Sequence, residues 1–418
     1  MTLVADRPET LPRLASAPIA RPRLASVDIV RGLVMVVMAL DHARDFFSLQ
    51  SVQGDPERLA DPGLALFFTR WVTHFCAPTF VFLAGVGAFL SLGRGRDRAA
   101  LSRFLVTRGL WLVVCEFTLV NIGWTFRPDL TFVVAQVIWA LGISMIVLAA
   151  LLWLPRWAVA KVGVAMIVGH NALAGVDAAL VGQAQAWALD GAHAAPLDAM
   201  GRLWSVVHVP RLVSFGFTTV LVRYPLIPWV GVMAAGYAFG PVLRLADAER
   251  RRTLLRVGLA LLVGFVLLRA SNVYGNPEPW SVKDSAANTL ISFVNVEKYP
   301  PSLLFLMLTL GTGLLLLRAA ERWTGPLASA LETFGRVPMF YYLLHVPLIH
   351  LLAVGVGLAM YGPAALSIGL ESAPAGWGFG LVVVYLVWMV VVVALYPVCR
   401  WYAGVKARRR DLTVLSYL

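Results

Sequence analysis

The chain has 418 residues and a net charge of +12, and 59% of its residues are hydrophobic while only 14% are charged. With a mean hydropathy of +0.76, this composition excludes an ordinary soluble globular protein. Apolar runs of about twenty residues recur along the chain, which is typical of a polytopic α-helical membrane protein. The alternating segments of about ten residues that build a membrane β-barrel are not seen in the sequence.

The chain begins with a Pro- and Arg-rich stretch, residues 1–22, which we expect to be a disordered cytoplasmic tail. It lacks the short apolar core and cleavage site of a signal peptide, so we expect the first helix to be retained. Residues 23–402 are predicted to form a single transmembrane domain, and residues 403–418 a basic cytoplasmic tail. The predicted fold is all-α, with about ten transmembrane helices around a polar central path. The predicted spans are 27–47, 64–92, 104–123, 131–154, 157–176, 226–246, 254–271, 302–319, 334–360 and 377–402.

Basic residues are distributed unevenly between the two sides of these spans. Most of the 35 Lys and Arg residues fall in the terminal tails and in the loops on the same side, such as residues 94–98 and 250–252. The positive-inside rule therefore predicts cytoplasmic termini, in a multi-pass protein of the inner (plasma) membrane. The positive charge is thus a topology signal, and we expect no nucleic acid as a partner.

The first predicted helix carries a stripe of polar residues. Read at helical spacing, one face presents Asp28, Arg31, Met35, Met38, His42 and Asp45. From its first to its last residue this stripe rises roughly 25 Å, nearly the thickness of a bilayer core. Ionisable groups are costly in lipid, so we expect the stripe to face a polar path through the protein. The alternative is that Asp28 and Arg31 form a local ion pair and the charges at the helix ends reach the membrane interface.

The second and third predicted helices add further ionisable side chains. His74 lies near the outer end of the second helix, at the level of His42, and Pro78 is expected to kink that helix. The third helix carries Glu116 and, at its outer end, Asn121, and a carboxylate inside a span is a candidate site residue. The alternatives are that His74 is an ordinary interface residue and that Glu116 is the structural partner of a buried base.

Two long outer segments follow. Residues 177–225 are apolar in their latter half but interrupted by proline, so we expect an interfacial or re-entrant element containing Arg211. The outer loop between the seventh and eighth spans mixes aromatic residues with Glu297 and Lys298, which suits a glycan or another polar ligand. The alternative is that its aromatic residues only anchor the loop at the membrane interface.

The ninth span places Tyr341, Tyr342 and His345 on adjoining helical rows, ahead of Pro347, which is expected to bend the helix. His350 lies about 140° away from His345 around the helix axis, so the two histidines cannot share a face. We therefore expect His345 and its tyrosines to line the polar path.

Common motifs of metal and nucleotide chemistry are missing from the sequence. It contains no His-Glu-x-x-His or Cys-x-x-Cys pattern, no Gly-x-Ser-x-Gly elbow and no P-loop. We therefore predict no metal. The three cysteines fall inside predicted spans, so no disulfide framework is implied.

What remains is a histidine flanked by acids, His42 between Asp41 and Asp45. This arrangement provides a base and carboxylates that could orient it. Such a base removes a proton from a hydroxyl or amine that attacks an activated carbonyl. A proton-coupled transporter of a small solute would place the same groups in a membrane, and a non-catalytic subunit of an envelope complex is a third option.

Three segments carry a resemblance to a known family. They are RLASVDIVRGLVMVVMALDHARDFF at residues 23–47, THFCAPTFVFLAGVGAFL and FGRVPMFYYLLHVPLIHLL. Together they resemble the bacterial branch of the heparan-α-glucosaminide N-acetyltransferase-like family, within the multi-helix transmembrane acyltransferases. The resemblance implies transfer of an acetyl or other short acyl group from cytoplasmic acyl-CoA to a glycan or glycolipid on the outer face. It implies acetyl-CoA as co-substrate, the lipid bilayer and a saccharide acceptor as partners, and a catalytic role for His42.

The helical rise from Arg31 to His42 is about 16 Å, comparable to an extended pantetheine arm. We therefore expect a cofactor held at the cytoplasmic mouth by Arg31 and Arg336 to present its thioester near His42. The oligomeric state stays open, with a homodimer as one option. The residues assigned to catalysis are His42, Asp41, Asp45 and His74, those assigned to the cofactor are Arg31, Arg336, Tyr342 and His345, and those assigned to the acceptor are Arg44, Glu116, Asn121, Arg211, Glu297 and Lys298.

Overall fold

The computed structural model describes residues 24–49, 63–92, 97–181, 197–369 and 373–409, together with residues 411, 412, 415 and 417. The tail predicted for residues 1–22 lies outside the described residues. The helices are α1 (Ala25–Phe47), α3 (Leu64–Trp71), α4 (Cys76–Leu92), α5 (Arg98–Cys115), α6 (Asn121–Thr125), α7 (Val137–Leu151), α8 (Arg156–Gly169), α9 (Ala174–Val181), α10 (Ala199–Val207), α11 (Leu226–Phe239), α12 (Asp247–Ser271), α13 (Ala286–Val294), α14 (Leu303–Ala320), α15 (Pro326–Arg336), α16 (Pro338–Tyr361) and α17 (Leu381–Arg408). The strands are β1 (Phe132–Ala135), β2 (Arg211–Phe215) and β3 (Thr218–Val222).

The polytopic α-helical membrane fold predicted from the sequence is confirmed. In the described part of the chain, 8 helical segments are long and apolar enough to cross a membrane. The remaining two predicted spans correspond to α7, which has 15 residues, and to the charged helix α1. Trp157, Leu267 and Val382 of α8, α12 and α17 are 63%, 65% and 74% exposed. Apolar side chains so exposed on long helices are expected to face lipid.

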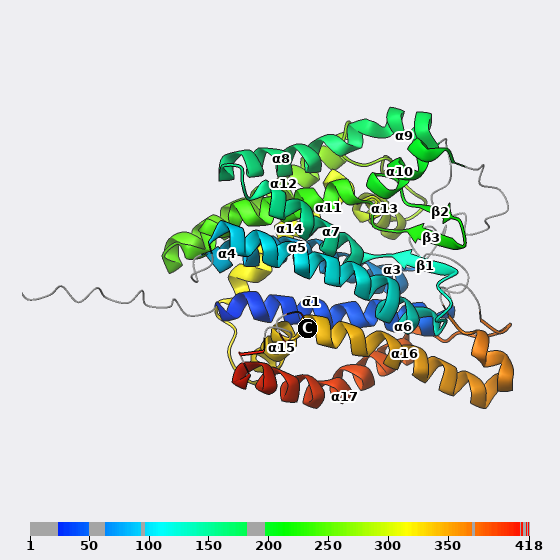
Figure 1. Ribbon diagram of the computed structural model, residues 1–418. Helices are drawn as coiled ribbons and strands as arrows, with labels where there is room; N and C mark the ends of the chain where they lie inside the picture. The colour runs from blue at the N-terminus through cyan, green and yellow to red at the C-terminus, as the bar shows by residue number, and fades with distance from the viewer. Residues whose placement is uncertain are drawn as a thin grey trace, which may run out of the picture.

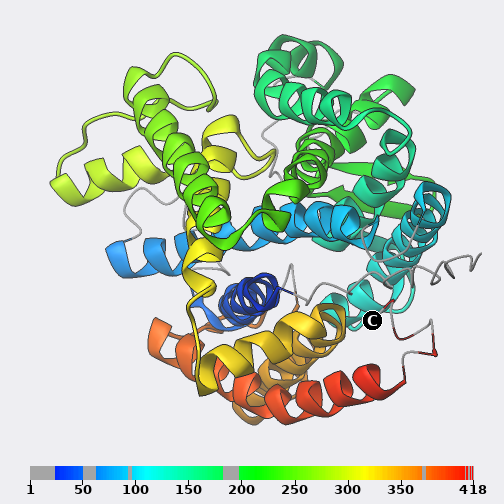
Figure 2. The ribbon, with the colours of Figure 1, turned by 90° about the vertical axis from the view of Figure 1, so that its left-hand side faces the viewer.

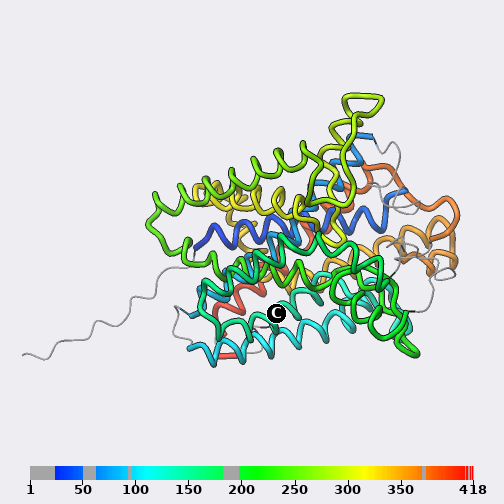
Figure 3. Tube along the Cα trace, turned by 90° about the horizontal axis from the view of Figure 1, so that it is seen from above, coloured from blue at the N-terminus to red at the C-terminus, as the bar shows by residue number. Residues whose placement is uncertain are grey.

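Helix α1 lies at the centre of the bundle (Figures 1 and 2). It packs against α15, α16 and α17 on one side and against α4 and α14 on the other. Glycines allow its closest contact, because a Cβ atom at Gly32 would collide with the backbone of α15, and one at Gly335 would collide with the backbone of α1. Small residues at such crossings let membrane helices approach backbone to backbone. The other long helices run roughly along the same axis, with α12 and α14 side by side (Figure 3).

A small sheet, which the sequence analysis did not predict, lies at the end of the bundle where α1 finishes (Figure 1). Its strand order is β1-β3-β2, with β1 parallel and β2 antiparallel to β3. Part of the segment 177–225 that was expected to be interfacial or re-entrant is thus a β-hairpin, preceded by α10. β-Branched residues in β1 and β3 favour this pairing.

Two predicted spans begin differently from the expectation. The span 131–154 starts with β1, so its helix α7 begins only at Val137. The span 334–360 is divided at Val337, which has φ −131° and ψ 48° and separates α15 from α16. Pro338 has no backbone N–H and disfavours a helical residue before it, which explains the break.

Candidate active site

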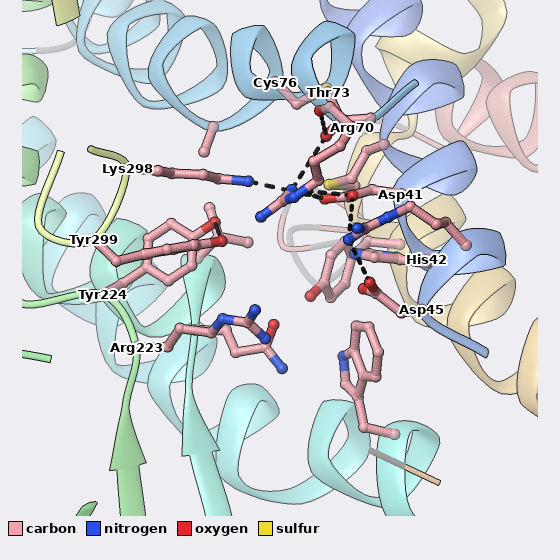
Figure 4. Close-up of a pocket in the computed structure, with 17 residues that line it drawn as sticks. Asp41, His42, Asp45, Arg70, Thr73, Cys76, Arg223, Tyr224, Lys298 and Tyr299 are labelled. Carbon is pink, nitrogen blue, oxygen red and sulfur yellow. Dashed lines mark hydrogen bonds and ion pairs between the residues drawn. The ribbon is translucent and has the colours of Figure 1, made fainter. Parts of the chain in front are cut away.

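A polar cavity of about 40 Å³ lies beside the C-terminal half of α1. Figure 4 shows Asp41, His42 and Asp45 on one side of it and Lys298 and Tyr299 on the other. The polar lining residues are Asp41, His42, Arg44, Asp45, Arg70, Thr73, Gln136, Arg223, Tyr224, Lys298, Tyr299 and Tyr342, and Trp124 lines the same space. The structure thus brings four sequence-predicted residues of α1 together with Lys298, which lies far away in the sequence.

Asp41 is the anion at the centre of an ion cluster. Its carboxylate accepts hydrogen bonds from Arg70 Nη1 at 2.8 and 3.0 Å. It also pairs with Arg44 at 3.1 Å and with Lys298 at 3.9 Å. The side chain of Arg70 is only 1% exposed, and a buried guanidinium needs a compensating carboxylate. Asp41 therefore joins α1, α3 and the loop before α14 by neutralising their cations.

Asp45 does not orient His42 in the way the helical spacing suggested. Its carboxylate accepts a hydrogen bond of 2.7 Å from Nη2 of Arg44, the neighbouring residue. Among the described residues, the hydrogen bonds of the His42 ring do not include one to Asp45. Arg44 pairs with both carboxylates, at 3.1 Å from Asp41 and 2.7 Å from Asp45.

The hydrogen-bond partner of His42 is a second histidine, His345 of α16. Nδ1 of His42 lies 2.8 Å from Nε2 of His345, and the two rings are nearly parallel, at 12°. Nδ1 of His345 lies 2.9 Å from the carbonyl oxygen of Tyr341. Because a carbonyl only accepts, a neutral His345 donates from Nδ1 and accepts at Nε2 the hydrogen bond from His42. Nε2 of His42 then carries a free lone pair, as a general base requires.

Two tyrosines close the far side of the cavity, with the hydroxyls of Tyr224 and Tyr299 3.4 Å apart. Burial raises the pKa of Tyr224 well above its usual value, and the neighbouring phenol adds to this. Burial acts in the same direction on Tyr299, but three nearby cations outweigh it and hold the pKa of Tyr299 below its usual value. These cations are Lys298, Arg223 and Arg70. The cations therefore stabilise negative charge at Tyr299, whereas burial opposes it at Tyr224.

A second, larger cavity of about 260 Å³ lies at the N-terminal end of α1. Arg31 lines it, and this side chain pairs with Asp28 and donates to the carbonyl oxygen of Gly335, at 3.3 Å in both cases. Arg108 of α5 lines the same cavity, although the sequence analysis did not select it. Arg336 does not line it, and its half-exposed side chain pairs with Glu332 on the same helix.

A third cavity, about 40 Å³ and mostly apolar, lies between the other two. It shares Met38, Cys76 and Tyr342 with the polar cavity, and it shares Phe80 and Arg108 with the larger cavity. The three cavities therefore follow one another along α1, from the level of Arg31 to that of His42. The rise between those two residues is about 16 Å.

Other predicted site residues lie away from these cavities. Glu116 is fully buried and accepts a 2.7 Å hydrogen bond from the backbone N–H of Trp139, so it caps the start of α7. Asn121 donates to the carbonyl oxygen of Phe132 and so holds β1.

Arg211 donates to the carbonyl oxygen of Val181, and Glu297 accepts from the backbone N–H of Tyr299 at 3.0 Å. His74 is 1% exposed, with its ring 5.4 Å from that of Phe305. These contacts support the loops and helices around the site, and none of the three residues lines the described cavities.

The sequence analysis missed several residues that line the polar cavity, namely Arg70, Trp124, Arg223, Tyr224 and Tyr299. Arg70 could have been found, because an arginine inside the apolar segment 64–92 is costly unless it is paired. The others lie in the short helix α6 (Trp124), directly after β3 (Arg223 and Tyr224) and in the loop before α14 (Tyr299), and they have no comparable signal in the sequence.

Comparison with known proteins identifies the family. The family model described as heparan-alpha-glucosaminide N-acetyltransferase, catalytic, matches residues 23–268. The match includes α1 with His42, as well as Arg70 and Arg108, while His345 and Lys298 lie outside it. No curated protein matches the chain. Because the matched segment is more than half of the sequence, the chain belongs to the heparan-alpha-glucosaminide N-acetyltransferase catalytic-domain family.

Proposed function

We propose that this protein transfers an acetyl or other short acyl group from acyl-CoA to a saccharide acceptor across the inner (plasma) membrane. Acyl-CoA enters at the N-terminal end of α1, on the cytoplasmic side, and the acceptor enters at the other end. The observation that carries this proposal is the series of three cavities along α1, from Arg31 and Arg108 to His42. Membership of an acetyltransferase family supports the chemistry.

The N-terminal end of α1, where acyl-CoA is proposed to enter, suits the charged part of this acyl donor. Arg31 and Arg108 line the cavity of about 260 Å³ there, and guanidinium groups bind phosphate strongly. Arg336 is exposed at the same end of the bundle, where it can meet the outermost phosphates. The apolar middle cavity is lined by side chains such as Met35, Phe80 and Leu112, which suit the pantetheine arm and the acyl chain.

The reaction at the acceptor end follows from the histidine pair. The acceptor hydroxyl or amine gives its proton to Nε2 of His42 while its oxygen or nitrogen attacks the thioester carbonyl carbon. His345 accepts the hydrogen bond from Nδ1 of His42 and so holds the ring in the required tautomer. When the intermediate collapses, the C–S bond breaks and the CoA thiolate takes the proton back from His42. Asp41 and Asp45 keep the cations of the cavity in place around this histidine.

The polar cavity at the outer end of the series must widen before an acceptor can enter it. The polar cavity of about 40 Å³ is far smaller than the several hundred Å³ typical of a small-molecule site. Arg44 and Lys298 line it and are proposed to bind the acceptor. Glu116, Asn121, Arg211 and Glu297 support the walls of this region, and His74 lies behind it in the turn between α3 and α4.

The test is acyl transfer by the purified full-length protein, with radiolabelled acetyl-CoA and a panel of envelope glycans. His42→Ala should lower turnover by about 10²–10⁴-fold, the usual contribution of a general base, while acetyl-CoA binding stays nearly intact. His170→Ala is the matched control, because His170 is also buried but belongs to a separate pair with His208. If the wild type neither transfers acetyl groups nor binds acetyl-CoA, but His42→Ala stops proton-coupled solute uptake, the protein is a transporter.

A further inference from the structure

We propose that Tyr342 and Trp124 form the oxyanion site of the transfer reaction, by donating hydrogen bonds to the carbonyl oxygen of the thioester. The inference rests on the proposed acyl transfer and assigns the groups that stabilise its transition state. Tyr342 lies on α16, and Trp124 lies in α6 at the end of the third apolar segment.

The first observation is that both residues hold buried donors that are directed to the same place. The indole of Trp124 lies beside the hydroxyl of Tyr342, and neither group makes a hydrogen bond of good geometry to an acceptor among the described residues. Each residue is only 2% exposed. Buried polar groups are normally paired, because a donor removed from water without a new partner destabilises the folded state. Two such donors beside one cavity therefore indicate a ligand that accepts from them.

The second observation is their position relative to the base. The rings of Trp124 and Tyr342 both stand edge-on to the ring of His42, with centroids at 4.8 and 6.1 Å and interplanar angles of 76° and 82°. Both residues line the polar cavity together with His42. The donors and the proposed base thus surround one small space.

The third observation is the place of Tyr342 between two cavities. It lines both the apolar middle cavity and the polar cavity, which meet at this side chain. A thioester threaded through the middle cavity would reach the base at that junction. The carbonyl oxygen would then arrive beside Tyr342, with Trp124 on the polar side.

With Tyr342 and Trp124 as hydrogen-bond donors and His42 as the base, every bond, electron pair and proton of the transfer step is accounted for. As the acceptor attacks the carbonyl carbon, the C=O double bond opens and its electron pair moves onto the oxygen. That oxyanion accepts hydrogen bonds from the O–H of Tyr342 and the N–H of Trp124, while the acceptor's proton moves to His42. When the carbonyl re-forms, the C–S bond breaks and the CoA thiolate recovers the proton. Fixed hydrogen-bond donors in a site without bulk water stabilise this oxyanion far more strongly than they stabilise the neutral carbonyl group.

The experiment removes each donor while keeping a ring in place. Tyr342→Phe and Trp124→Phe should each lower kcat by about 10²–10³-fold, the usual effect of losing one oxyanion donor, with little change in KM for acetyl-CoA. Tyr402→Phe and Trp139→Phe are matched controls. They also remove buried donors that lack partners, but from residues that do not line the described cavities. Both controls should keep near wild-type kcat.

A spectroscopic measurement separates this role from a structural one. The infrared carbonyl stretch of bound acetyl-CoA labelled with ¹³C at the carbonyl should lie at lower frequency than that of free acetyl-CoA in the wild type. This shift should be lost in Tyr342→Phe and reduced in Trp124→Phe. Wild-type transfer with both variants fully active, or with an unchanged carbonyl shift, would overturn the oxyanion site and leave the proposed function standing. Absence of transfer by the wild type itself would instead reject the proposed function.

Discussion

At the scale of single residues, the chemistry depends on which groups already have partners. Asp41 and Asp45 are each paired with arginine, and no hydrogen bond from the His42 ring to either carboxylate is found among the described residues. His345 takes that place, and the carbonyl of Tyr341 fixes its tautomer. A neutral partner suits a buried site, because a carboxylate there would bring another charge that needs compensation.

This arrangement predicts a positioning role for His345. His345→Ala should lower kcat by about 10²-fold, since the loss cannot exceed the contribution of the base that it orients. His345→Gln should recover part of the rate, because the amide oxygen can still accept from Nδ1 of His42. Steady-state kinetics with acetyl-CoA should show the loss in kcat and not in KM.

A double-variant cycle is the sharper measurement. If His345 acts only through His42, the variant carrying both alanines should be no slower than His42→Ala alone. Additive losses would show that His345 acts independently of the base, and the proposed positioning role would be wrong.

At the scale of elements, the break between α15 and α16 determines how α1 is held. The separate helix α15 crosses α1 at Gly32 and Gly335, where the backbones touch. That crossing places Arg31 next to the last turn of α15, where it donates to the carbonyl oxygen of Gly335. The donor end of the cavity series therefore depends on a contact between two glycines.

Alanine at Gly335 should destabilise the protein. The added methyl would meet the carbonyl oxygen of Asp28, and forced overpacking usually costs about 1–3 kcal/mol. We expect a lower Tm in detergent and weaker acetyl-CoA binding. Gly355→Ala on α16 is the control, because nothing lies within 4 Å of the added carbon. An equal Tm for both variants would contradict the backbone contact.

At the scale of the whole molecule, charge and cavity volume both distinguish the two ends of the bundle. The basic loops and the cavity of about 260 Å³ belong to the end where α1 begins, while the sheet and the cavity of about 40 Å³ belong to the other. The positive-inside rule predicts that the roomier end faces the cytoplasm, which is the side from which we propose that acyl-CoA enters. Orientation in the membrane is therefore the property on which the direction of transfer depends.

Cysteine labelling measures this orientation. In a variant without Cys76, Cys115 and Cys399, an impermeant thiol reagent should label Ser285→Cys in intact cells. Ser329→Cys should react only after lysis. Both positions are exposed, and they lie on the loop before α13 and on α15, toward opposite ends of the bundle (Figure 1). The reverse pattern would place the acyl-CoA end outside and contradict the proposed direction.

The sequence by itself determined the membrane class and the approximate helix positions, because hydropathy and helical periodicity are local properties of the chain, and it selected His42 as the candidate base. It also placed His345 near the polar path. Only the tertiary structure decided that His345 bonds to His42, that Asp41 pairs with Arg70, and that Glu116 caps a helix. Each of these contacts joins segments from different helices, and the choice among partners depends on how the helices pack. The small sheet was missed for the same reason, since β1 pairs with a strand that lies far along the chain.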